Sequence, residues 1–326
     1  MKAVVCIKYG PPEVLQIKEV EKPKPKDNEV LIKIATTSVT IADSRVRGFN
    51  VPLSFWIPAR IALGFTKPRK SILGSELSGE IESVGKDVKQ FKKGDCVFAS
   101  TGHTMGAYAE YCCMTENTCL AIKPKNLSYE EAAVISFGGI TALQFLRKGN
   151  IKQGDKVLIY GASGSVGTYA VQLAKYFGAV VTGVCSTVNL EMVKSLGADH
   201  VIDYTTTDFT KTGEHYDFIF DTVGKTQIYR TIKLLNPAGT YIHAVATPVT
   251  TMRIRLGLIG SKKKLIGGSF TSNAEQLNYL RKLVEEGTIK PIIDRLYSIE
   301  QIIEAHRYVD QGHKKGNVAI TVWREE

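Results

Sequence analysis

The segment "VLIYGASGSVGTYAVQLAK", residues 157–175, joins an apolar, strand-like stretch to a run of glycines and then to a helix-like stretch. Gly161, Gly164 and Gly167 follow one another at intervals of three residues. Glycine permits a tight turn after the strand and lets the backbone approach a ligand closely. The N–H groups at the start of the next helix lack intrahelical partners and carry partial positive charge. The segment therefore predicts a strand–turn–helix unit that binds the diphosphate of a dinucleotide.

Two other interpretations of this loop do not match its residues. A phosphate-binding loop of the Walker A type ends in Gly-Lys-Ser/Thr, but here Gly167 is followed directly by Thr168. A nucleophile elbow requires Gly-x-Ser-x-Gly, and Ser163 is followed by Gly164 and then Ser165. A strand–turn–helix corner that uses glycine only for its geometry remains the structural alternative.

The same alternation of strand and helix continues on both sides of the loop. Apolar strand-like pieces are separated by helical stretches: "KVLIYG" (156–161), "VVTGVC" (180–185), "HVIDY" (200–204), "YDFIFD" (216–221) and "GTYIHAV" (239–245). Strands that alternate with helices favour right-handed crossovers and a parallel sheet. We therefore expect an α/β fold with a Rossmann doubly wound parallel sheet.

The flanking regions have a different pattern. The first hundred-odd residues contain strand-like pieces and turns, such as "EVLIKIATTSV" at 29–39. The chain ends in another strand-like piece, "GNVAITVW" at 316–323. The simplest arrangement folds both ends together. We expect a β-rich domain from residues 1–122 plus 266–326 and a Rossmann domain from residues 123–265.

Three helix starts carry a Ser followed three residues later by Glu or Gln, which is the pattern of a capping box. The pairs are Ser128 with Glu131, Ser272 with Glu275, and Ser298 with Gln301.

Composition excludes several classes of protein. The chain has 326 residues, of which 44% are hydrophobic and 23% charged, as in ordinary globular proteins. We expect no membrane span, because no long uninterrupted apolar run occurs, and we find no signal-peptide pattern at the start. The six cysteines are few for this length, which favours reduced thiols in a cytoplasmic protein over a disulfide framework.

The formal net charge of +10 leaves several partners open. The densest basic segments, "KPKPK" at 22–26 and "SKKKL" at 261–265, are short. A solvated basic surface is the simplest interpretation, and attraction of an anionic small ligand is the next. We expect neither a nucleic-acid partner nor a membrane partner, and we expect a homodimer.

The residues after the second strand of the Rossmann unit bear on the choice of dinucleotide. An acidic residue about 20 residues beyond the glycine loop would accept the ribose hydroxyls of NAD. The tip of that strand reads Cys185-Ser186-Thr187-Val188-Asn189 and contains no acid. Hydroxyls and an amide suit a 2′-phosphate, so we expect NADPH. Alternatively, Ser186 and Thr187 simply cap the next helix.

With these segments, the sequence resembles the medium-chain dehydrogenase/reductase superfamily. The blocks that carry the resemblance are "GDKVLIYGASGSVGTYAVQLAK", "LGADHVIDY", "YDFIFDTVGK", "LGSELSGEIESVGKDVKQFKKGDCVFA" and "GAYAEYCCMTEN". It is most similar to the zinc-independent quinone oxidoreductase branch, which includes zeta-crystallin. The resemblance covers nearly the whole chain and implies that the β-rich domain is a GroES-like catalytic domain.

The zinc ligands of the superfamily's alcohol dehydrogenases are absent from the matching positions. Thr40, in "TSVTIADSR", stands where those enzymes have a cysteine, and Ser75 replaces the histidine of Gly-His-Glu. Zinc needs nitrogen or sulfur ligands, so we expect no metal. The resemblance then implies a hydride transfer to an acceptor that is already electrophilic, which is a quinone or an α,β-unsaturated carbonyl. An NAD(P)-dependent alcohol or aldehyde oxidoreductase, and a non-enzymatic nucleic-acid-binding protein that depends on a dinucleotide, remain alternatives.

Candidate site residues follow from the resemblance. Thr40 is the candidate catalytic residue, which would hydrogen-bond the nicotinamide ribose or the substrate oxygen; alternatively it is a buried threonine satisfied by its own backbone. Phe49, Phe55 and Phe65 would line a lid over a flat apolar substrate, or else form loop core or a subunit contact. The expected cofactor-binding residues are Thr141, Ser163, Gly164, Ser165, Val166, Gly167, Ser186, Asn189, Tyr204, Thr222, Val223, Gly224, Ala244, Val245, Phe270 and Asn317.

Overall fold

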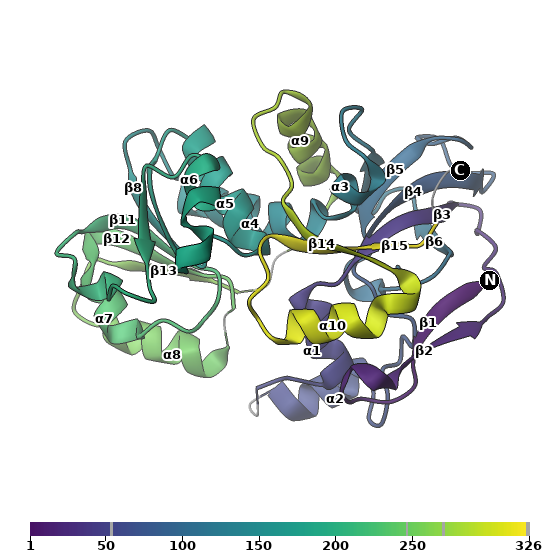
Figure 1. Cartoon of the computed structure of the whole chain (residues 1–326), viewed down its shortest axis with the longest axis horizontal. Helices are drawn as coiled ribbons and strands as arrows, with labels where there is room; N and C mark the ends of the chain where they lie inside the picture. Colours follow the sequence, from purple (N-terminus) through teal and green to yellow (C-terminus); the bar gives the residue numbers. More distant parts are fainter. Residues whose placement is uncertain (53–54, 246, 269–270, 324–326) are drawn as a thin grey trace. The chain divides into compact units, whose positions relative to one another are not determined.

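The structure is a computed structural model that describes residues 1–52, 55–245, 247–268 and 271–323. The chain forms two compact units, and Figure 1 labels their elements. The first unit comprises Met1–Phe137, Ser272–Gly287 and Pro291–Glu326, and the second comprises Gly138–Thr271 and Thr288–Lys290. The second unit thus begins 15 residues and ends six residues after the boundaries expected from sequence, and the short segment Thr288–Lys290 also belongs to it.

The second unit contains a six-stranded sheet in which every neighbouring pair of strands is parallel. The strands lie in the order β10 (His200–Asp203), β9 (Val180–Cys185), β8 (Lys156–Tyr160), β11 (Tyr216–Asp221), β12 (Leu235–His243) and β13 (Lys264–Gly267). In chain order this is 3-2-1-4-5-6, which is the strand order of the Rossmann fold. The predicted fold class is confirmed. The strand order reverses between β8 and β11, because β9 and β10 are added on one side of β8 and β11 to β13 on the other. Such folds bind their ligands at this point of the sheet.

Helices pack on this sheet and bury its apolar side chains. They are α4 (Ser136–Gly149), α5 (Ser165–Tyr176), α6 (Leu190–Ser195), α7 (Ile228–Lys233) and α8 (Pro248–Gly257). One buried cluster joins Leu158 and Ile219 of the central strands to Ile232 of α7 and Ile254 of α8. The strands are apolar on both faces, which is typical of a parallel sheet covered by helices. This core holds the carboxyl ends of the strands at one edge of the sheet.

The first unit is built around a seven-stranded, mostly antiparallel sheet. Its strands are β14 (Ile293–Ser298), β15 (Asn317–Thr321), β3 (Glu29–Ser38), β4 (Glu76–Val84), β5 (Cys96–Ser100) and β7 (Leu120–Ile122), with β6 (Tyr111–Thr115) also paired to β3. β1 (Lys2–Cys6) and β2 (Leu15–Glu19) form a separate antiparallel pair. Because β15 pairs with β3, the C-terminal segment completes a sheet that the N-terminal region begins.

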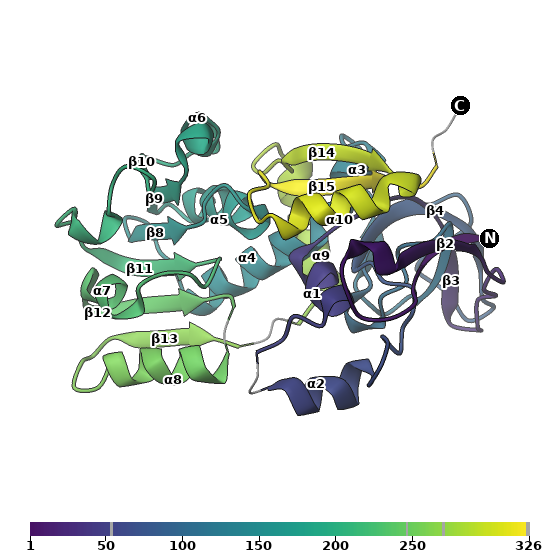
Figure 2. The same cartoon turned by 60° about the horizontal axis from the view of Figure 1, so that its bottom comes forward.

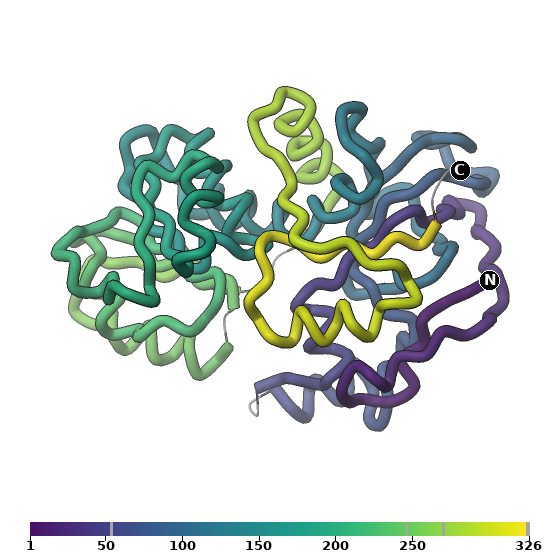
Figure 3. The backbone as a smooth tube through the Cα atoms, in the orientation of Figure 1, coloured from purple at the N-terminus to yellow at the C-terminus, as the bar shows by residue number. Residues whose placement is uncertain are grey.

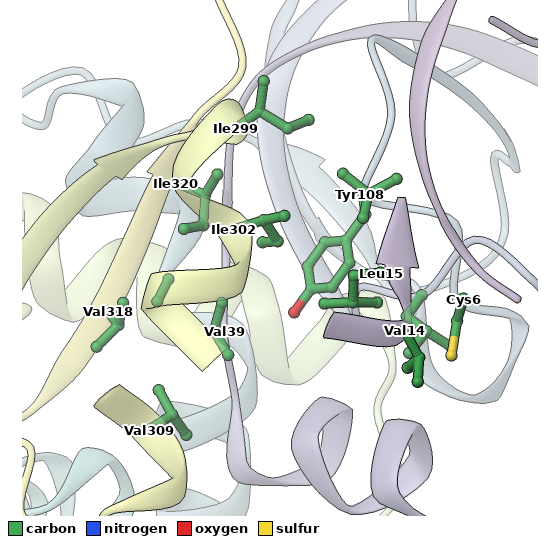
Figure 4. Close-up of a cluster of buried hydrophobic side chains, with 13 residues drawn as sticks. Cys6, Val14, Leu15, Val39, Tyr108, Ile299, Ile302, Val309, Val318 and Ile320 are labelled. Carbon is green, nitrogen blue, oxygen red and sulfur yellow. The ribbon is translucent and has the colours of Figure 1, made fainter. Parts of the chain in front are cut away.

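The helices of the first unit are α1 (Ile41–Gly48), α2 (Trp56–Leu63), α3 (Tyr129–Ala133), α9 (Ala274–Glu285) and α10 (Ile302–Asp310). The backbone trace brings the last helix beside the N-terminal segments (Figure 3). Figure 4 shows the core between them, where Tyr108 lies among Leu15, Val39 and Ile302. Segments almost 300 residues apart in the chain therefore share one core.

Two of the three predicted capping boxes are confirmed, and the third is wrong by one residue. Ser128 and Glu131 form a capping box at the start of α3, and Ser298 and Gln301 form one before α10. The N-cap of α9 is Asn273, not Ser272, because the amide oxygen of Asn273 accepts the hydrogen bond from the backbone N–H of Gln276. Asparagine is as good an N-cap as serine, so the sequence pattern alone did not distinguish Asn273 from Ser272 as the N-cap.

Candidate functional site

The glycine loop of the second unit forms a tight turn between β8 and α5. Gly161 has a φ of 81°, in the left-handed region that favours glycine. Its N–H and that of Ala162 donate to the carbonyl of Val184 at 3.1 and 3.0 Å, which fixes the turn to β9. A Cβ on Gly167 would lie 2.0 Å from the carbonyl oxygen of Gly161, so only glycine lets the helix pack this closely on the turn.

The space around Gly164 is more open than the space around Gly167. It is the N-cap of α5, and no side chain caps the helix. A Cβ at Gly164 would meet only the carbonyl oxygen of Gly161, at an ordinary 3.5 Å. Its φ of −82° is accessible to any residue. Since folding does not require glycine here, the open space in front of the helix N-terminus is available to an anion.

The tip of β9 is tied to this loop by Asn189. Its amide nitrogen donates to the Oγ atoms of Ser163 and Ser186 at 3.2 and 3.0 Å. Its amide oxygen is buried and accepts no hydrogen bond from any residue that the structure describes. A buried acceptor without a donor is costly, and a ribose hydroxyl is a suitable donor. The residues present therefore fit a dinucleotide with its diphosphate at the helix N-terminus and a ribose at Asn189.

The turn after β11 is organised by one buried carboxylate. Asp221 is 1% exposed. Its Oδ1 accepts from the backbone N–H groups of Val223 and Gly224 at 3.0 and 2.7 Å. Its Oδ2 accepts from the hydroxyls of Thr226 and Tyr241 at 2.9 and 3.0 Å. Asp221 thus fixes Val223 and Gly224 at the same edge of the sheet as the glycine loop, without facing a ligand itself.

A pocket of about 360 Å³ opens beside this turn. Tyr160, Tyr204, Lys225 and Gln227 line it together with a run of threonines in the crossover after β10. The pocket provides hydroxyl groups, the ammonium group of Lys225 and the carboxylate of Asp208 next to the end of β8. Lys225 was not identified from sequence, because its position in this pocket depends on how the β10 crossover folds over the sheet.

The tip of β9 contains no acid of its own, as expected from its sequence, but the neighbouring strand β10 supplies one. Asp203 ends β10 and is the register partner of Cys185. The hydroxyl of Thr187 donates to its Oδ2 at 2.5 Å, and the N–H and hydroxyl of Thr205 donate to its Oδ1 at 2.9 and 2.6 Å. The hydroxyl bonds from Thr187 and Thr205 keep the pKa of Asp203 below its usual value. An ionised carboxylate therefore contacts the tip, supplied by the neighbouring strand.

Most of the expected cofactor-binding residues lie in the second unit at the carboxyl ends of its strands. Thr141 lies buried in α4, and Phe270 falls outside the described residues. The others in this unit follow β8, β9, β10, β11 or β12 directly: Ser163, Gly164, Ser165, Val166, Gly167, Ser186, Asn189, Tyr204, Thr222, Val223, Gly224, Ala244 and Val245. Parallel strands present their carboxyl ends at one edge, so these residues share a face.

Thr40 lies in the first unit as the N-cap of α1. Its hydroxyl donates to Oδ2 of Asp43 at 2.6 Å and accepts from the backbone N–H of Asp43, while its own N–H donates to the same carboxylate. The hydroxyl of Ser75 lies 3.1 Å from Asp43 Oδ2 and 3.2 Å from the Thr40 hydroxyl. The hydrogen-bonding groups of Thr40 are thus satisfied within the first unit, mainly by the carboxylate of Asp43.

The hydroxyls of Thr40 and Ser75 do not fit a zinc site. They offer neither the sulfur nor the imidazole nitrogen that zinc takes in proteins, and both are committed to Asp43. Within the described part of the chain, no group of three His, Cys, Asp or Glu side chains is arranged to hold a metal ion.

Two carboxyl groups are buried in this part of the first unit, Asp43 and Glu76, and the charge of one acts on the other. Burial raises the pKa of Asp43 to about 6 and that of Glu76 to about 7, against the opposing effect of their hydrogen bonds. Glu76 accepts from the hydroxyls of Ser38 and Ser136 at 2.5 and 2.9 Å and from the N–H of Phe137 at 2.7 Å. The charge of Asp43 further raises the pKa of Glu76. Sequence reasoning missed this pair, since nothing local marks either residue as buried.

We expect Glu76→Gln to flatten the dependence of stability on pH. The unfolded carboxyl, with a pKa of 4.5, loses its proton before the folded one, whose pKa is about 7. The folded state therefore binds more protons between these values, so stability falls as the pH rises through this interval. The shift corresponds to about 3 kcal/mol. The amide oxygen of glutamine can accept the hydrogen bonds from Ser136 and Phe137, and its NH2 group can donate to the hydroxyl of Ser38. Glutamine therefore mimics the protonated form of Glu76.

Urea unfolding at a series of pH values measures this effect. Glu80→Gln, on the same strand but partly exposed, is the matched control. If the variant at position 76 keeps a pH profile parallel to that of the unmodified protein, Glu76 does not cause the fall.

Lys314 is a further titratable group that the sequence did not mark. It precedes β15, and burial lowers its pKa to about 8 while the charges of Glu76 and Asp294 oppose the shift. Its Nζ donates to the carbonyl of Gly316 at 2.5 Å. A lysine with this pKa can release or take up a proton near neutral pH.

The expected substrate-binding aromatics lie in and around α2. Phe49 is buried; its ring lies 4.8 Å from that of Tyr9, and the Arg60 guanidinium lies 3.8 Å from the ring centre. Phe55 and Phe65 are exposed. Phe49 therefore belongs to a local loop core. Asn317, expected to contact the cofactor, begins β15 and donates through its side-chain amide to the carbonyl of Ile292.

Among the residues that the structure describes, none of the helices has the length and apolar character of a membrane span.

Two protein families match parts of this sequence: "Alcohol dehydrogenase GroES-like domain" over residues 26–124 and "Zinc-binding dehydrogenase" over residues 196–320. Together they match segments from both units.

Relatives of known name cover almost the whole chain. A 2-methylene-furan-3-one reductase of Solanum lycopersicum is 32% identical, over 98% of this chain and 79% of the relative. The mitochondrial NAD(P)H oxidoreductase RTN4IP1 of Danio rerio is 32% identical, over 100% of this chain and 92% of the relative. The solved structure of a quinone oxidoreductase from Coxiella burnetii is 31% identical, with a TM-score of 0.88 over 99% of both chains.

Proposed function

The chain belongs to the medium-chain dehydrogenase/reductase superfamily, in its zinc-independent quinone-oxidoreductase-like branch, and on this premise we propose that it reduces a quinone or an α,β-unsaturated carbonyl with NADPH. It is an oxidoreductase that depends on NAD(P)H. The choice of NADPH and the class of acceptor are the parts that we propose.

The glycine loop at the start of α5, together with Asn189, is the observation on which the proposal rests. Gly164 leaves space at the helix N-terminus although the fold does not require glycine there. Asn189, 4% exposed, has a buried amide oxygen that accepts no hydrogen bond from the described residues, and its amide nitrogen donates to Ser163 of the same loop. When bound, the nicotinamide cofactor supplies the hydride. The protein residues hold the diphosphate, orient the ribose and fix the nicotinamide end through the turns after β11 and β12.

The hydroxyl groups of Thr40 and Ser75 in the first unit favour a hydride acceptor that is electrophilic without activation by the protein. Both hydroxyls donate hydrogen bonds to the carboxylate of Asp43. They therefore do not polarise a substrate carbonyl in the way that a Lewis-acidic metal ion does. A quinone, or the β-carbon of an enone, accepts hydride without strong polarisation of its oxygen. The named relatives include one reductase of an enone-type substrate and one quinone oxidoreductase.

A panel of acceptors tests the proposal. We expect oxidation of NADPH with 9,10-phenanthrenequinone and with a simple enone, and no reduction of NAD⁺ with simple alcohols. Turnover of alcohols or aldehydes without turnover of quinones and enones would contradict it. Binding of NADPH without turnover of any acceptor would favour the non-enzymatic alternative.

Lys225 provides a test of the choice of dinucleotide. Its ammonium lines the pocket with Tyr204, and a cation there would pair with a 2′-phosphate. We expect Lys225→Ala to weaken binding of 2′,5′-ADP and NADPH about tenfold, or about 1.4 kcal/mol, and to leave NADH binding unchanged. Titration calorimetry measures both affinities without turnover.

Lys233→Ala is the matched control, because Lys233 is an exposed lysine of α7 in the same unit and does not line the pocket. An equal loss of NADH and NADPH binding in Lys225→Ala would mean that Lys225 acts on the adenosine or on the fold instead of the 2′-phosphate.

The remaining expectations stay predictions. All six cysteines are free thiols, as a reducing compartment such as the cytoplasm would keep them. We propose that Phe55 and Phe65 contact an apolar substrate and that the protein is a homodimer. A contact between Thr40 and the nicotinamide ribose also stays a prediction.

A further inference from the structure

Three strands of the first unit begin or end at the same edge of its sheet. β3 ends at Ser38, whose register partner on the antiparallel strand β15 is Ala319. On the other side of β3, the Ser38 hydroxyl donates to Glu76, the first residue of β4. The N–H of Val39 donates to the carbonyl of Val318 at 3.0 Å, so β3 and β15 stay together beyond the end of β3. The residues just outside these strand ends are therefore neighbours.

Lys314 reaches this edge from the loop that joins α10 to β15, three residues before β15 begins. Figure 2 shows β14 and β15 side by side, with the loop at the end where β15 begins. Thr40 and Ser75, whose hydroxyls are 3.2 Å apart, directly follow β3 and precede β4 at the same edge. The charge of Glu76 acts on the ammonium group of Lys314. The chain thus brings a lysine to the polar cluster of the first unit.

The ammonium group of Lys314 has unused hydrogen-bond donors. One N–H donates to the carbonyl of Gly316, and no carboxylate of the described residues forms an ion pair with it. Oδ2 of Asp294 accepts instead from the hydroxyl of Tyr308 and the backbone N–H of Lys315, at 2.5 and 2.8 Å. Lys314 is partly buried, and a cation removed from water without a paired anion is costly. Two N–H groups are thus left for an anionic oxygen.

The proposed reduction produces such an oxygen. The acceptor needs no activation before the hydride arrives, but an electron pair then moves onto its carbonyl oxygen. The hydroxyls of Thr40 and Ser75 donate to Asp43 and do not neutralise this charge. A donor placed where negative charge develops stabilises the transition state. Burial lowers the pKa of Lys314 to about 8, so the ammonium form is present at neutral pH and releases its proton readily.

We propose that Lys314 binds the carbonyl oxygen of the acceptor and donates a proton to it as the oxygen becomes negative. This inference rests on the proposed function. An N–H bond of the ammonium group breaks and an O–H bond forms, and the neutral amine then takes a proton from water. The hydride and this proton are the two hydrogens that the acceptor gains. A quinone becomes the hydroquinone, and an enone becomes the enol, which isomerises to the saturated carbonyl compound.

The dependence of turnover on pH tests the proton transfer. We expect Lys314→Met to lower kcat for an enone about a hundredfold at saturating NADPH, as loss of a general acid does. In the unmodified protein kcat/KM should fall as the pH rises through about 8, the pKa that burial and the opposing charges of Glu76 and Asp294 give Lys314. Lys314→Met should lack this fall. Lys314→Arg should keep part of the rate without the fall, because arginine stays protonated.

Lys315→Met is the matched control. Lys315 is exposed, and its backbone N–H, not its side chain, bonds Asp294. Its pH profile and kcat should equal those of the unmodified protein. The thermal midpoint of each variant shows whether it folds.

Binding of 4-nitrophenolate to the protein with NADP⁺ tests the oxygen site without turnover, because this anion resembles the product before it is protonated. We expect Lys314→Met to weaken its binding at least about tenfold and to leave NADPH binding unchanged, both measured by titration calorimetry.

The inference is overturned if the unmodified protein does not bind 4-nitrophenolate, or if Lys315→Met has the same effects as Lys314→Met. It is also overturned if Lys314→Met weakens NADPH binding and keeps kcat, since Lys314 would then pair with a phosphate of the dinucleotide. Equal reduction of an enone by the unmodified protein and Lys314→Met refutes the inference and leaves the proposed function intact. Binding of 4-nitrophenolate through Lys314 without turnover of any quinone or enone refutes the proposed function and, with it, the proton transfer.

Discussion

Gly164→Ala is expected to weaken dinucleotide binding at least about tenfold, or about 1.4 kcal/mol, while the protein stays folded. The added methyl group meets only the Gly161 carbonyl oxygen, at 3.5 Å, and the backbone at this position suits alanine. Alanine is a poorer N-cap than glycine but loses less conformational entropy on folding, so stability changes little. The methyl group instead occupies the space through which a diphosphate would reach the helix N-terminus.

Gly167→Ala is the matched substitution that separates folding from binding. Its Cβ would lie 2.0 Å from the Gly161 carbonyl oxygen and 2.8 Å from the backbone of Ala162. We expect a loss of about 3 kcal/mol of stability, because backbone atoms must move to make room. Dinucleotide binding is then lost through displacement of the turn.

Fluorescence titration with NADPH and NADH, together with urea unfolding of each variant, measures both effects. If Gly164→Ala binds both dinucleotides as well as the unmodified protein, the helix N-terminus does not hold the diphosphate and the proposed function fails. If Gly167→Ala is as stable as the unmodified protein, the close packing of helix and turn is not needed for folding.

Asp310→Ala is expected to destabilise the first unit by about 3 kcal/mol or more, because it leaves a buried guanidinium without its counter-charge. The side chain of Arg47 is 3% exposed, and its NH2 lies 2.8 Å from Asp310 Oδ2. Its other donors reach the Gly10 carbonyl and Nδ1 of His306. Burial and the charge of Arg47 lower the pKa of His306 to about 3, so this histidine stays neutral and its Nδ1 accepts the hydrogen bond from Arg47.

The same helix provides the control. Arg307 of α10 pairs with Glu13 at 2.6 Å, but both side chains are about half exposed. Exposed pairs contribute little to stability, so Glu13→Ala should change the free energy of unfolding far less than Asp310→Ala does. Equal and small losses for Asp310→Ala and Glu13→Ala in urea unfolding would show that Arg47 reaches water when its partner is removed.

The extent to which the site could be read from sequence differs between its parts. The glycine loop could be predicted because a strand end, a turn and a helix start are consecutive in the chain. The N-cap of α9 was missed by one residue, because Ser272 and Asn273 are neighbouring candidates and only the backbone geometry selects Asn273. Asp203 was missed because it contacts Thr187 through the pairing of two strands, 16 residues further along the chain.

The sequence by itself determined the doubly wound sheet and the glycine turn between β8 and α5, since both depend on periodicity and on glycines a few residues apart. Only the tertiary structure decided that Asp43, Ser75 and Glu76 form one buried polar cluster, and that Asp310 neutralises Arg47 from 263 residues away. It also decided that the charge of Glu76 acts on Lys314. Burial and pairing depend on which distant segments pack together, and no local pattern of residues records that.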